Sequence, residues 1–218
     1  MYAKHWDIYR RPESKPKITG FKYFYPERAR LMHVEQPLFE ALSTNPLWIA
    51  EPKYNGKRLQ LHHLPDGTWQ FWNRHEQRMS YTPSADLLAD LEGLDLKGYW
   101  LFDGELRDGK VKGIRHRIAL YDVIIAGGDL LLGTTFGDRR GILETLFHYC
   151  GPYAGDLLDL APQYEGNFRQ VFDGFREDRE IEGLVIKNLG GKLNLGRTRA
   201  ADSSWQWKVR KASNVVRF

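Results

Sequence analysis

The sequence predicts one α+β domain in which antiparallel sheets pack against helices, for three reasons. Its 218 residues, of which 42% are hydrophobic and 28% charged, suit one domain with a sizeable core. Short runs with strand patterns follow one another in hairpin order. Helical patterns interrupt these runs, whereas a doubly wound fold would alternate strands and helices regularly.

The elements follow from apolar spacing. Four segments have apolar residues three or four apart, which is typical of helices: 34–42, 84–94, 137–150 and 167–178. In the second, Ser84 is placed to cap the helix and Gly93 to end it. Seven runs have the pattern of strands: 47–54, 58–64, 68–74, 99–106, 116–125, 182–189 and 203–211. A Pro-Asp-Gly turn should join the second and third runs as a hairpin.

The sequence also indicates in which cellular compartment the protein is expected. No apolar run approaches the ~18 residues that a membrane helix needs, and the charged N-terminal stretch does not resemble a signal peptide. We therefore expect an intracellular protein, in the cytoplasm of a bacterium or virus-infected cell, or in a nucleus or nucleoid. The single cysteine, Cys150, excludes an internal disulfide and a cysteine-based zinc cluster, and a partly buried thiol is expected there.

Basic residues gather in four runs, often beside aromatic residues: 9–17, 107–117, 191–199 and 207–217. The net charge of +4 and the sequence pI of about 9.1 make a polyanionic partner plausible. Any one run taken alone is more readily explained as solvated surface. The histidines at 62, 63 and 116 have no metal-ligand spacing, so we expect surface residues there.

Three ionisable residues interrupt strand patterns that are otherwise apolar: Lys53, Glu105 and Glu182. A buried lysine is costly unless it is paired or loses its proton. The simpler interpretations are a lysine that extends to the surface and carboxylates on an exposed strand face. Taken singly, these residues leave both interpretations open.

Six short motifs occur in one order along the chain: EPKYNGKR, WNRH, FDGEL, LYDV, EGLVIK and WKVR. Between about Glu51 and Arg210 they resemble the nucleotidyl motifs of the ATP-dependent DNA ligases, within the covalent nucleotidyltransferases that also include RNA ligases and mRNA capping enzymes. One motif is weak support, whereas six in order are specific. The resemblance implies a nucleotidyltransferase (ATP-grasp-like) domain with the nucleotide in a groove between antiparallel sheets.

The resemblance implies that Lys53 is the nucleophile. It would attack the α-phosphorus of ATP, release pyrophosphate and carry AMP through a phosphoramidate bond. An ammonium has no lone pair for this attack, so neighbouring cations should favour the neutral amine and offset the phosphate charge. Lys187, Lys208 and Arg210 are expected to do this.

Further nucleotide contacts are implied by position in the motifs. Glu51 would accept from the adenine amino group, which favours ATP over GTP. Arg58 would contact the ribose, and Tyr121 would stack on the adenine. On residues alone, Tyr121 would be a core residue and Arg58 part of a surface ion pair.

Metal and nick contacts are implied in the same way. Glu182 would hold Mg²⁺ or Mn²⁺, and Glu105 would lie near the ribose hydroxyls or the metal. Arg74 would grip the 5′-phosphate at a nick, because a guanidinium fits phosphate geometry, and Arg210 would add charge there.

The chain departs from the family pattern in three places. Asn55 stands where the first motif usually has aspartate, and Arg210 stands where the last usually has lysine. Only eight residues follow Arg210, so we expect the oligonucleotide-binding barrel of DNA ligases to be absent. Residues 1–218 should then form one domain, with 1–46 as its N-terminal extension.

The resemblance therefore predicts an ATP-dependent polynucleotide ligase, a monomer that uses ATP and Mg²⁺ or Mn²⁺ to seal nicked duplex DNA in repair or replication, away from membranes. An RNA ligase is the nearest alternative, because its first-motif turn varies more widely. A capping guanylyltransferase is a more distant one. The non-enzyme alternative is a degenerate nucleic-acid-binding relative.

Overall fold

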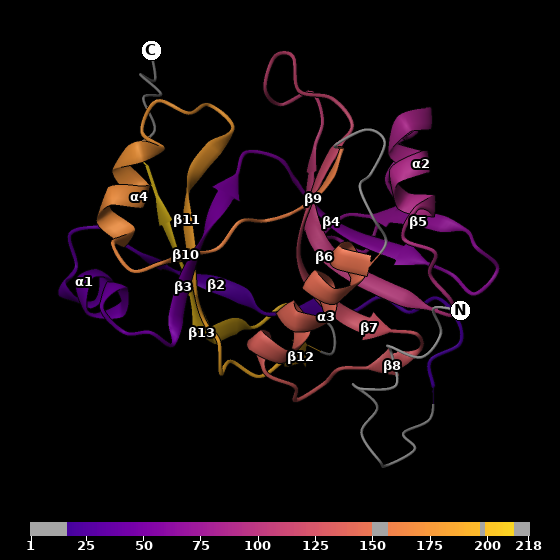
Figure 1. Cartoon of the computed structure of the whole chain (residues 1–218), viewed down its shortest axis with the longest axis horizontal. Helices are drawn as coiled ribbons and strands as arrows, with labels where there is room; N and C mark the ends of the chain where they lie inside the picture. Colours follow the sequence, from indigo (N-terminus) through magenta and orange to yellow (C-terminus); the bar gives the residue numbers. More distant parts are fainter. Residues whose placement is uncertain (1–16, 150–156, 197–198, 212–218) are drawn as a thin grey trace.

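Two sheets form the centre of the protein, with helices on their outer sides (Figure 1). The computed structural model describes residues 17–149, 157–196 and 199–211; Cys150 and most of the basic run 9–17 lie outside these ranges. The first sheet contains, in spatial order, β10 (Tyr164–Glu165), β3 (Trp48–Tyr54), β11 (Ile181–Asn188), β13 (Asp202–Arg210) and β2 (Arg28–Met32).

The second sheet is built around the predicted hairpin, which is confirmed. It contains, in spatial order, β5 (Trp69–Trp72), β4 (Lys57–His63), β6 (Trp100–Arg107), β7 (Arg117–Ala126) and β8 (Asp129–Leu130), with β9 (Leu158–Leu160) also beside β7. A small third sheet pairs β1 (Tyr25–Pro26) with β12 (Leu195–Gly196).

All seven predicted strands are confirmed, with ends that differ by one or two residues. The predicted antiparallel sheets are confirmed, and two short strands add parallel pairs to them: β2 pairs parallel to β13 and β9 pairs parallel to β7. Both β2 and β9 are short strands that reach their partners through long connections. Such strands carry too little periodic pattern to be recognised from sequence.

The four predicted helices are present as α1 (Pro37–Ser43), α2 (Ala85–Glu92), α3 (Phe136–Tyr149) and α4 (Phe168–Gly174). The predicted caps of α2 are confirmed: Ser84 Oγ accepts the Leu87 N–H at 3.2 Å, and the helix ends at Gly93. The predicted end of α4, at residue 178, is wrong. None of the described helices combines the length and apolar character that a membrane crossing requires.

Helices cover one face of each sheet and leave the other face free. α2 and α3 pack on the second sheet through residues such as Leu91 and Leu143, and α1 and α4 pack on the first through Phe39 and Phe172. Because side chains alternate along a strand, the polar residues between these apolar positions point to the opposite faces. The polar faces of the two sheets therefore line a common cleft.

The expectation of surface histidines is wrong for two of the three. His62 is fully buried and His63 nearly so. His62 lies against Tyr99, whose hydroxyl is 2.8 Å from Nδ1. Two neighbouring histidines on an alternating strand cannot both face solvent unless both faces of the sheet are exposed.

Candidate active site

Asn55 and Gly56 link the two sheets. β3 pairs with β10 and β11 in the first sheet, whereas β4 pairs with β5 and β6 in the second, so this Asn-Gly pair joins strands that are not hairpin partners. A Cβ atom at Gly56 would lie 2.5 Å from Glu105 Cγ, so only glycine allows this approach. Lys53 and Arg58, on either side of the link, therefore belong to opposite walls of one cleft.

The structure brings every sequence-predicted site residue to this cleft, whose volume is about 1430 Å³. They come from β3, β4, β6, β7, β11 and β13 and from the turn after β5: Glu51, Lys53, Arg58, Arg74, Glu105, Tyr121, Glu182, Lys187, Lys208 and Arg210. Pockets that bind drug-sized ligands have volumes of roughly 300–1,000 Å³. The cleft therefore has room for a nucleotide and for part of a second ligand.

Lys53 forms an ion pair with Glu182 across neighbouring strands of the first sheet. The Lys53 side chain is 20% exposed and that of Glu182 is 31% exposed, so both remain accessible from the cleft. Beside this pair, Gly183 lets β11 approach β13, because its φ is +149° and a Cβ atom would clash with the Val209 carbonyl. The nucleophile expected from the sequence is thus held by the carboxylate expected to bind metal.

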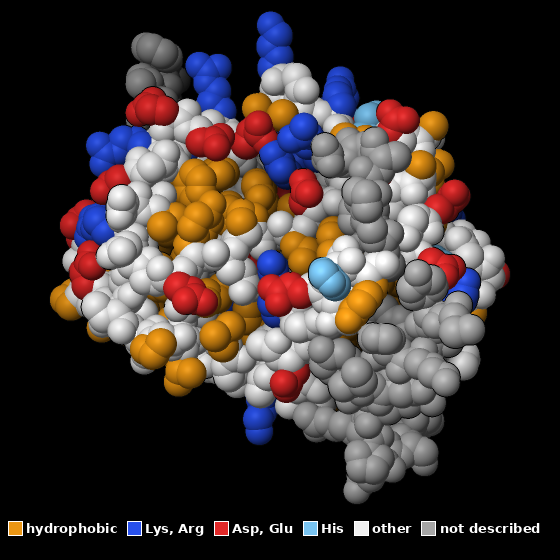
Figure 2. All heavy atoms as spheres, viewed as in Figure 1, with side chains coloured by type: hydrophobic (Ala, Val, Ile, Leu, Met, Phe, Trp, Pro, Cys, Tyr) orange, Lys and Arg blue, Asp and Glu red, His pale blue; other side chains and the backbone are white. Residues whose placement is uncertain are grey.

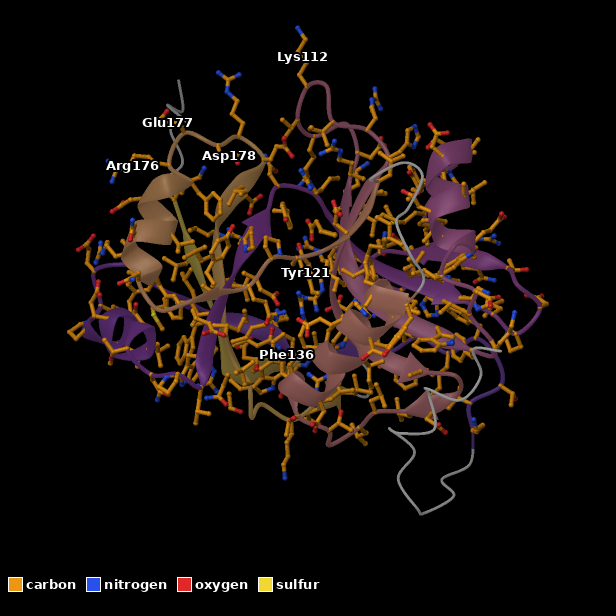
Figure 3. All side chains as sticks on the ribbon, viewed as in Figure 1. Lys112, Tyr121, Phe136, Arg176, Glu177 and Asp178 are labelled. Carbon is orange, nitrogen blue, oxygen red and sulfur yellow. The ribbon has the colours of Figure 1, made fainter. Side chains whose placement is uncertain are left out.

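Glu51 and Lys187 form a buried ion pair that the sequence did not predict. Lys187 Nζ lies 2.6 Å from Glu51 Oε2, and Gln163 Nε2 donates to Glu51 Oε1 at 2.9 Å. The ammonium also lies 4.5 Å from the ring of Phe136 and 5.4 Å from that of Tyr121, the two aromatic residues at the centre of Figure 3. The charge of Lys187 is therefore largely compensated by Glu51.

Lys208 is surrounded by other cations, Lys53 among them. Burial, followed by the charges of Arg210, Lys53 and Arg28, lowers the pKa of Lys208. Arg210 lies on β13 with Lys208, Arg28 lies on the adjoining strand β2, and Lys53 lies on β3. Unlike Lys187, Lys208 has no carboxylate at ion-pair distance among the residues that the structure describes.

Arg58 is fixed by a residue that sequence reasoning missed. Its Nε and Nη2 atoms bind the two carboxylate oxygens of Asp103 at 2.8 and 2.5 Å. Asp103 lies two residues before Glu105 on β6, so the alternation of the FDGEL motif was a signal that both face the cleft. On residues alone, Arg58 was expected in a surface ion pair. It does form an ion pair, but its partner is Asp103 and the pair lies within the cleft.

Glu105 and Tyr121 lie side by side on the wall formed by the second sheet. Burial raises the pKa of Glu105 to about 7, although the charges of Lys53, Arg58 and Lys110 oppose it. Tyr121 Oη donates to Glu105 Oε2 at 3.4 Å. Burial also raises the pKa of Tyr121 well above its usual value, so its hydroxyl stays a donor at neutral pH.

Arg74 lies on the exposed turn that follows β5. Asn73 fixes this turn, because its Oδ1 accepts the His75 N–H at 2.8 Å and the Gln77 N–H at 3.2 Å. Arg74 has no carboxylate at ion-pair distance within the described residues, and its Nε donates to His75 Nε2 at 3.1 Å. Its guanidinium is therefore available to an anion at the edge of the cleft.

A divalent cation could be held by Glu105 and Glu182, which face the cleft from opposite walls. Within the described ranges, no group of three or more histidine, cysteine, aspartate or glutamate residues forms a protein-only metal cage. Mg²⁺ is usually bound by one or two carboxylates together with substrate phosphates. The donor set fits a cation that arrives with a nucleotide.

The segment after α4 supports the link formed by Asn55 and Gly56, which follows the Lys53 strand β3. Asn55 N donates to the Glu180 carbonyl at 2.7 Å, and Asn55 Nδ2 to the Arg179 carbonyl at 3.4 Å. Arg107 forms an ion pair with Glu180 and lies 4.5 Å from the ring of Tyr54. Contacts from the segment after α4 and from β6 therefore fix the position of the link.

Lys211 holds the segment that follows α4. Its Nζ donates to the carbonyls of Phe175 at 2.8 Å and Asp178 at 2.5 Å, which lie beyond the last residue of the helix, Gly174. This lysine, placed by sequence in a run that favoured polyanion binding, is therefore a structural residue. Nothing in the motif pattern distinguishes it from Lys208.

The fold is that of the nucleotidyltransferase domains of ATP-dependent ligases, which confirms the fold predicted from the sequence. The chain is 24% identical to DNA ligase 1 of Schizosaccharomyces pombe over a 194-residue alignment that covers 76% of this chain and 25% of that protein. No family model matches the sequence.

Solved structures extend this likeness to most of the chain. A mycobacterial DNA ligase D complexed with ATP matches with a TM-score of 0.63 and 23% identity, over 87% of this chain and 62% of that one. The ATP complex of the bacteriophage T7 ATP-dependent DNA ligase matches with a TM-score of 0.58 and 17% identity, over 86% and 69%. The chain thus spans a quarter of the curated relative and under two thirds of the first structure.

Proposed function

We propose that this chain is the adenylating domain of an ATP-dependent polynucleotide ligase whose substrate is nicked DNA. The observation that carries the proposal is the convergence of ten motif residues, from six strands and one turn, on a single cleft with Lys53 in its wall. These residues, which lie between Glu51 and Arg210 in the sequence, are close enough in the cleft for one ligand to contact them.

In the first step, the Lys53 amine would form a bond to the α-phosphorus of ATP as the bond from that phosphorus to the bridging oxygen breaks and pyrophosphate leaves. The ion pair with Glu182 holds the ammonium in the nucleotide-free protein. It has to open, and the proton has to depart, before the lone pair can attack. Lys208 and Arg210 would then offset the phosphate charge.

The adenosine would lie between the walls of the cleft. Tyr121 offers an aromatic face, the Arg58–Asp103 pair offers fixed polar atoms for the ribose, and Glu51 offers acceptor oxygens for the adenine amino group. A divalent ion held by Glu182, with Glu105, would neutralise phosphate charge and orient the leaving group.

In the second step, AMP would pass from Lys53 to the 5′-phosphate at a nick, after which the 3′-hydroxyl attacks that phosphate and AMP leaves. Arg74, unpaired at the edge of the cleft, is suited to hold the 5′-phosphate. The basic walls supply sequence-independent contacts to the backbone.

Intact-protein mass spectrometry after incubation with ATP and Mg²⁺ tests the first step. We expect the wild-type protein to gain the mass of one AMP, and the Lys53→Ala variant to gain none. Absence of an adduct with both ATP and GTP would overturn the enzyme proposal, and an adduct with GTP alone would indicate capping chemistry.

The pre-adenylylated protein then tests the substrate. Nicked duplex DNA, a nicked RNA strand on DNA or RNA, and single-stranded RNA should be offered in parallel. Sealing of nicked DNA is the expected result, and sealing confined to RNA strands would identify an RNA ligase.

A further inference from the structure

A basic loop between β6 and β7, residues 108–116, projects from the edge of the cleft. Figure 1 shows this β6–β7 loop extending beyond the strands, and Figure 3 shows Lys112 pointing outward from its tip. Lysine and arginine side chains project from the same edge in Figure 2. Lys110 and Lys112 are exposed, and neither has a carboxylate at ion-pair distance in the part of the chain that the structure describes.

Contacts at its base give the loop a defined shape. Gly109 N donates to the Ile114 carbonyl at 3.1 Å, and Asp108 Oδ1 accepts the His116 N–H at 3.3 Å. The Tyr81 hydroxyl lies 2.8 Å from His116 Nδ1, which ties the loop to the chain that precedes α2. A loop that is already ordered pays little conformational entropy when it binds a ligand.

The loop continues the positive wall of the cleft outward. Lys110 lines the same cleft as Lys53 and Arg74, and its charge acts on Glu105. Lys112 follows two residues later at the tip. A strand that passed the nick site and left the cleft on this side would meet first Lys110 and then Lys112.

The segment after α4 has a different charge pattern. Arg176 is paired with Asp173 at 3.0 Å there, and the acidic residues Glu177 and Asp178 are followed by the exposed Arg179 (Figure 3). Its charges are therefore mixed, whereas the two loop lysines have no carboxylate at ion-pair distance among the described residues and attract a polyanion.

We propose that the β6–β7 loop is a contact surface for the phosphate backbone of the nucleic acid beside the nick, with Lys110 and Lys112 as its ionic contacts. The inference rests on the proposed function, since it assigns a surface for the substrate of that site. Contacts of this kind are independent of sequence and sensitive to salt.

Binding of a fluorescent nicked duplex, followed by anisotropy over a series of salt concentrations, tests the surface. The wild type is compared with the double variant Lys110→Ala/Lys112→Ala. Each lysine that contacts a phosphate contributes about 0.9 to the slope of log K against log salt. We expect the double variant to lose about two from that slope and to bind more weakly at low salt.

Two control variants test whether the change in slope is specific to the charges of the two loop lysines. Lys97→Ala removes an exposed lysine that is paired with Asp95 at 2.6 Å and lies outside the cleft, so it should keep the wild-type slope. Lys110→Arg/Lys112→Arg should keep it too, since the charges remain. An unchanged slope in the alanine variant, or an equal loss in either control, would overturn the inference.

The AMP adduct separates failure of this inference from failure of the proposed function. A wild-type protein that forms the adduct and binds the nick, while the alanine variant keeps the full slope, defeats the loop assignment alone. A wild-type protein that neither forms the adduct nor binds the nick defeats both.

Discussion

Replacing Glu105 by glutamine should stabilise the protein above neutral pH. Glu105 is 9% exposed on the wall of the cleft, and burial raises its pKa from 4.5 to about 7 despite the nearby charges of Lys53, Arg58 and Lys110. The ionised carboxylate is therefore costly to keep in the folded protein. Glutamine has a similar shape, keeps an acceptor for the Tyr121 hydroxyl and has no charge.

The size and the sign of this change in stability follow from the coupling between proton binding and folding. A carboxyl group with a higher pKa in the folded protein than in the unfolded one binds its proton more tightly when folded. Its ionisation therefore costs almost no stability below about pH 4.5, and the full penalty applies above about pH 7. At about 1.4 kcal/mol per pKa unit, the rise from 4.5 to about 7 corresponds to about 3 kcal/mol at pH 8. At pH 5 the penalty is below about 1 kcal/mol.

Urea unfolding of the nucleotide-free protein at pH 5 and pH 8 provides the assay. The free energy of unfolding of Glu105→Gln, relative to the wild type, should increase by about 2 kcal/mol between these pH values. The control Glu92→Gln makes the same change on the exposed side of α2 and should show no such increase. A difference between Glu105→Gln and the wild type that does not depend on pH would refute the reasoning.

Three further predictions concern buried polar residues. Arg139→Met should lower the free energy of unfolding by about 3–5 kcal/mol in urea titrations, because it leaves Asp122 without the guanidinium that binds both its oxygens. The double variant Arg139→Met/Asp122→Leu also removes the buried carboxylate and should recover most of that loss. Burial lowers the pKa of His62 to about 3. The stability that depends on its neutral form is therefore complete above pH 6.5 and is lost as the pH falls. In His62→Phe, the free energy of unfolding should depend less on pH between pH 6.5 and 4. Lys211→Met should cost about 1–3 kcal/mol, since carbonyls of the segment after α4 lose their donor. Lys208→Met, on the strand β13 that precedes Lys211, should cost less.

Elements with a long periodic pattern were predictable, and very short ones were not. β6 and β7 have eight and ten residues, enough for alternation to be visible in the sequence. β10 has two residues and β9 has three, and each is a strand only because β3 or β7 offers it a free edge. Tertiary pairing, which single-sequence patterns do not contain, decides such elements.

The motifs predicted which residues line the cleft but not how they pair. Glu51 and Lys187 are separated by more than 130 residues, and their ion pair depends on the register of β3 with β11, which sets Glu51 opposite Val185 and so diagonal to Lys187. Gln163 comes from a connection without any pattern. Asp103 was missed as well, although alternation along β6 could have placed it on the same face as Glu105.

Asn55 is the residue at which the first motif departs from the family pattern that the sequence resembles, and the structure gives the amide a use that a carboxylate could not serve. The backbone N–H of Asn55 already binds the Glu180 carbonyl, and its side chain approaches a second carbonyl, that of Arg179. A carbonyl oxygen needs a donor, which an amide provides and an ionised carboxylate does not. The asparagine therefore suits a link that must be held against the segment after α4, and this link fixes Lys53 in one wall of the cleft and Arg58 in the other.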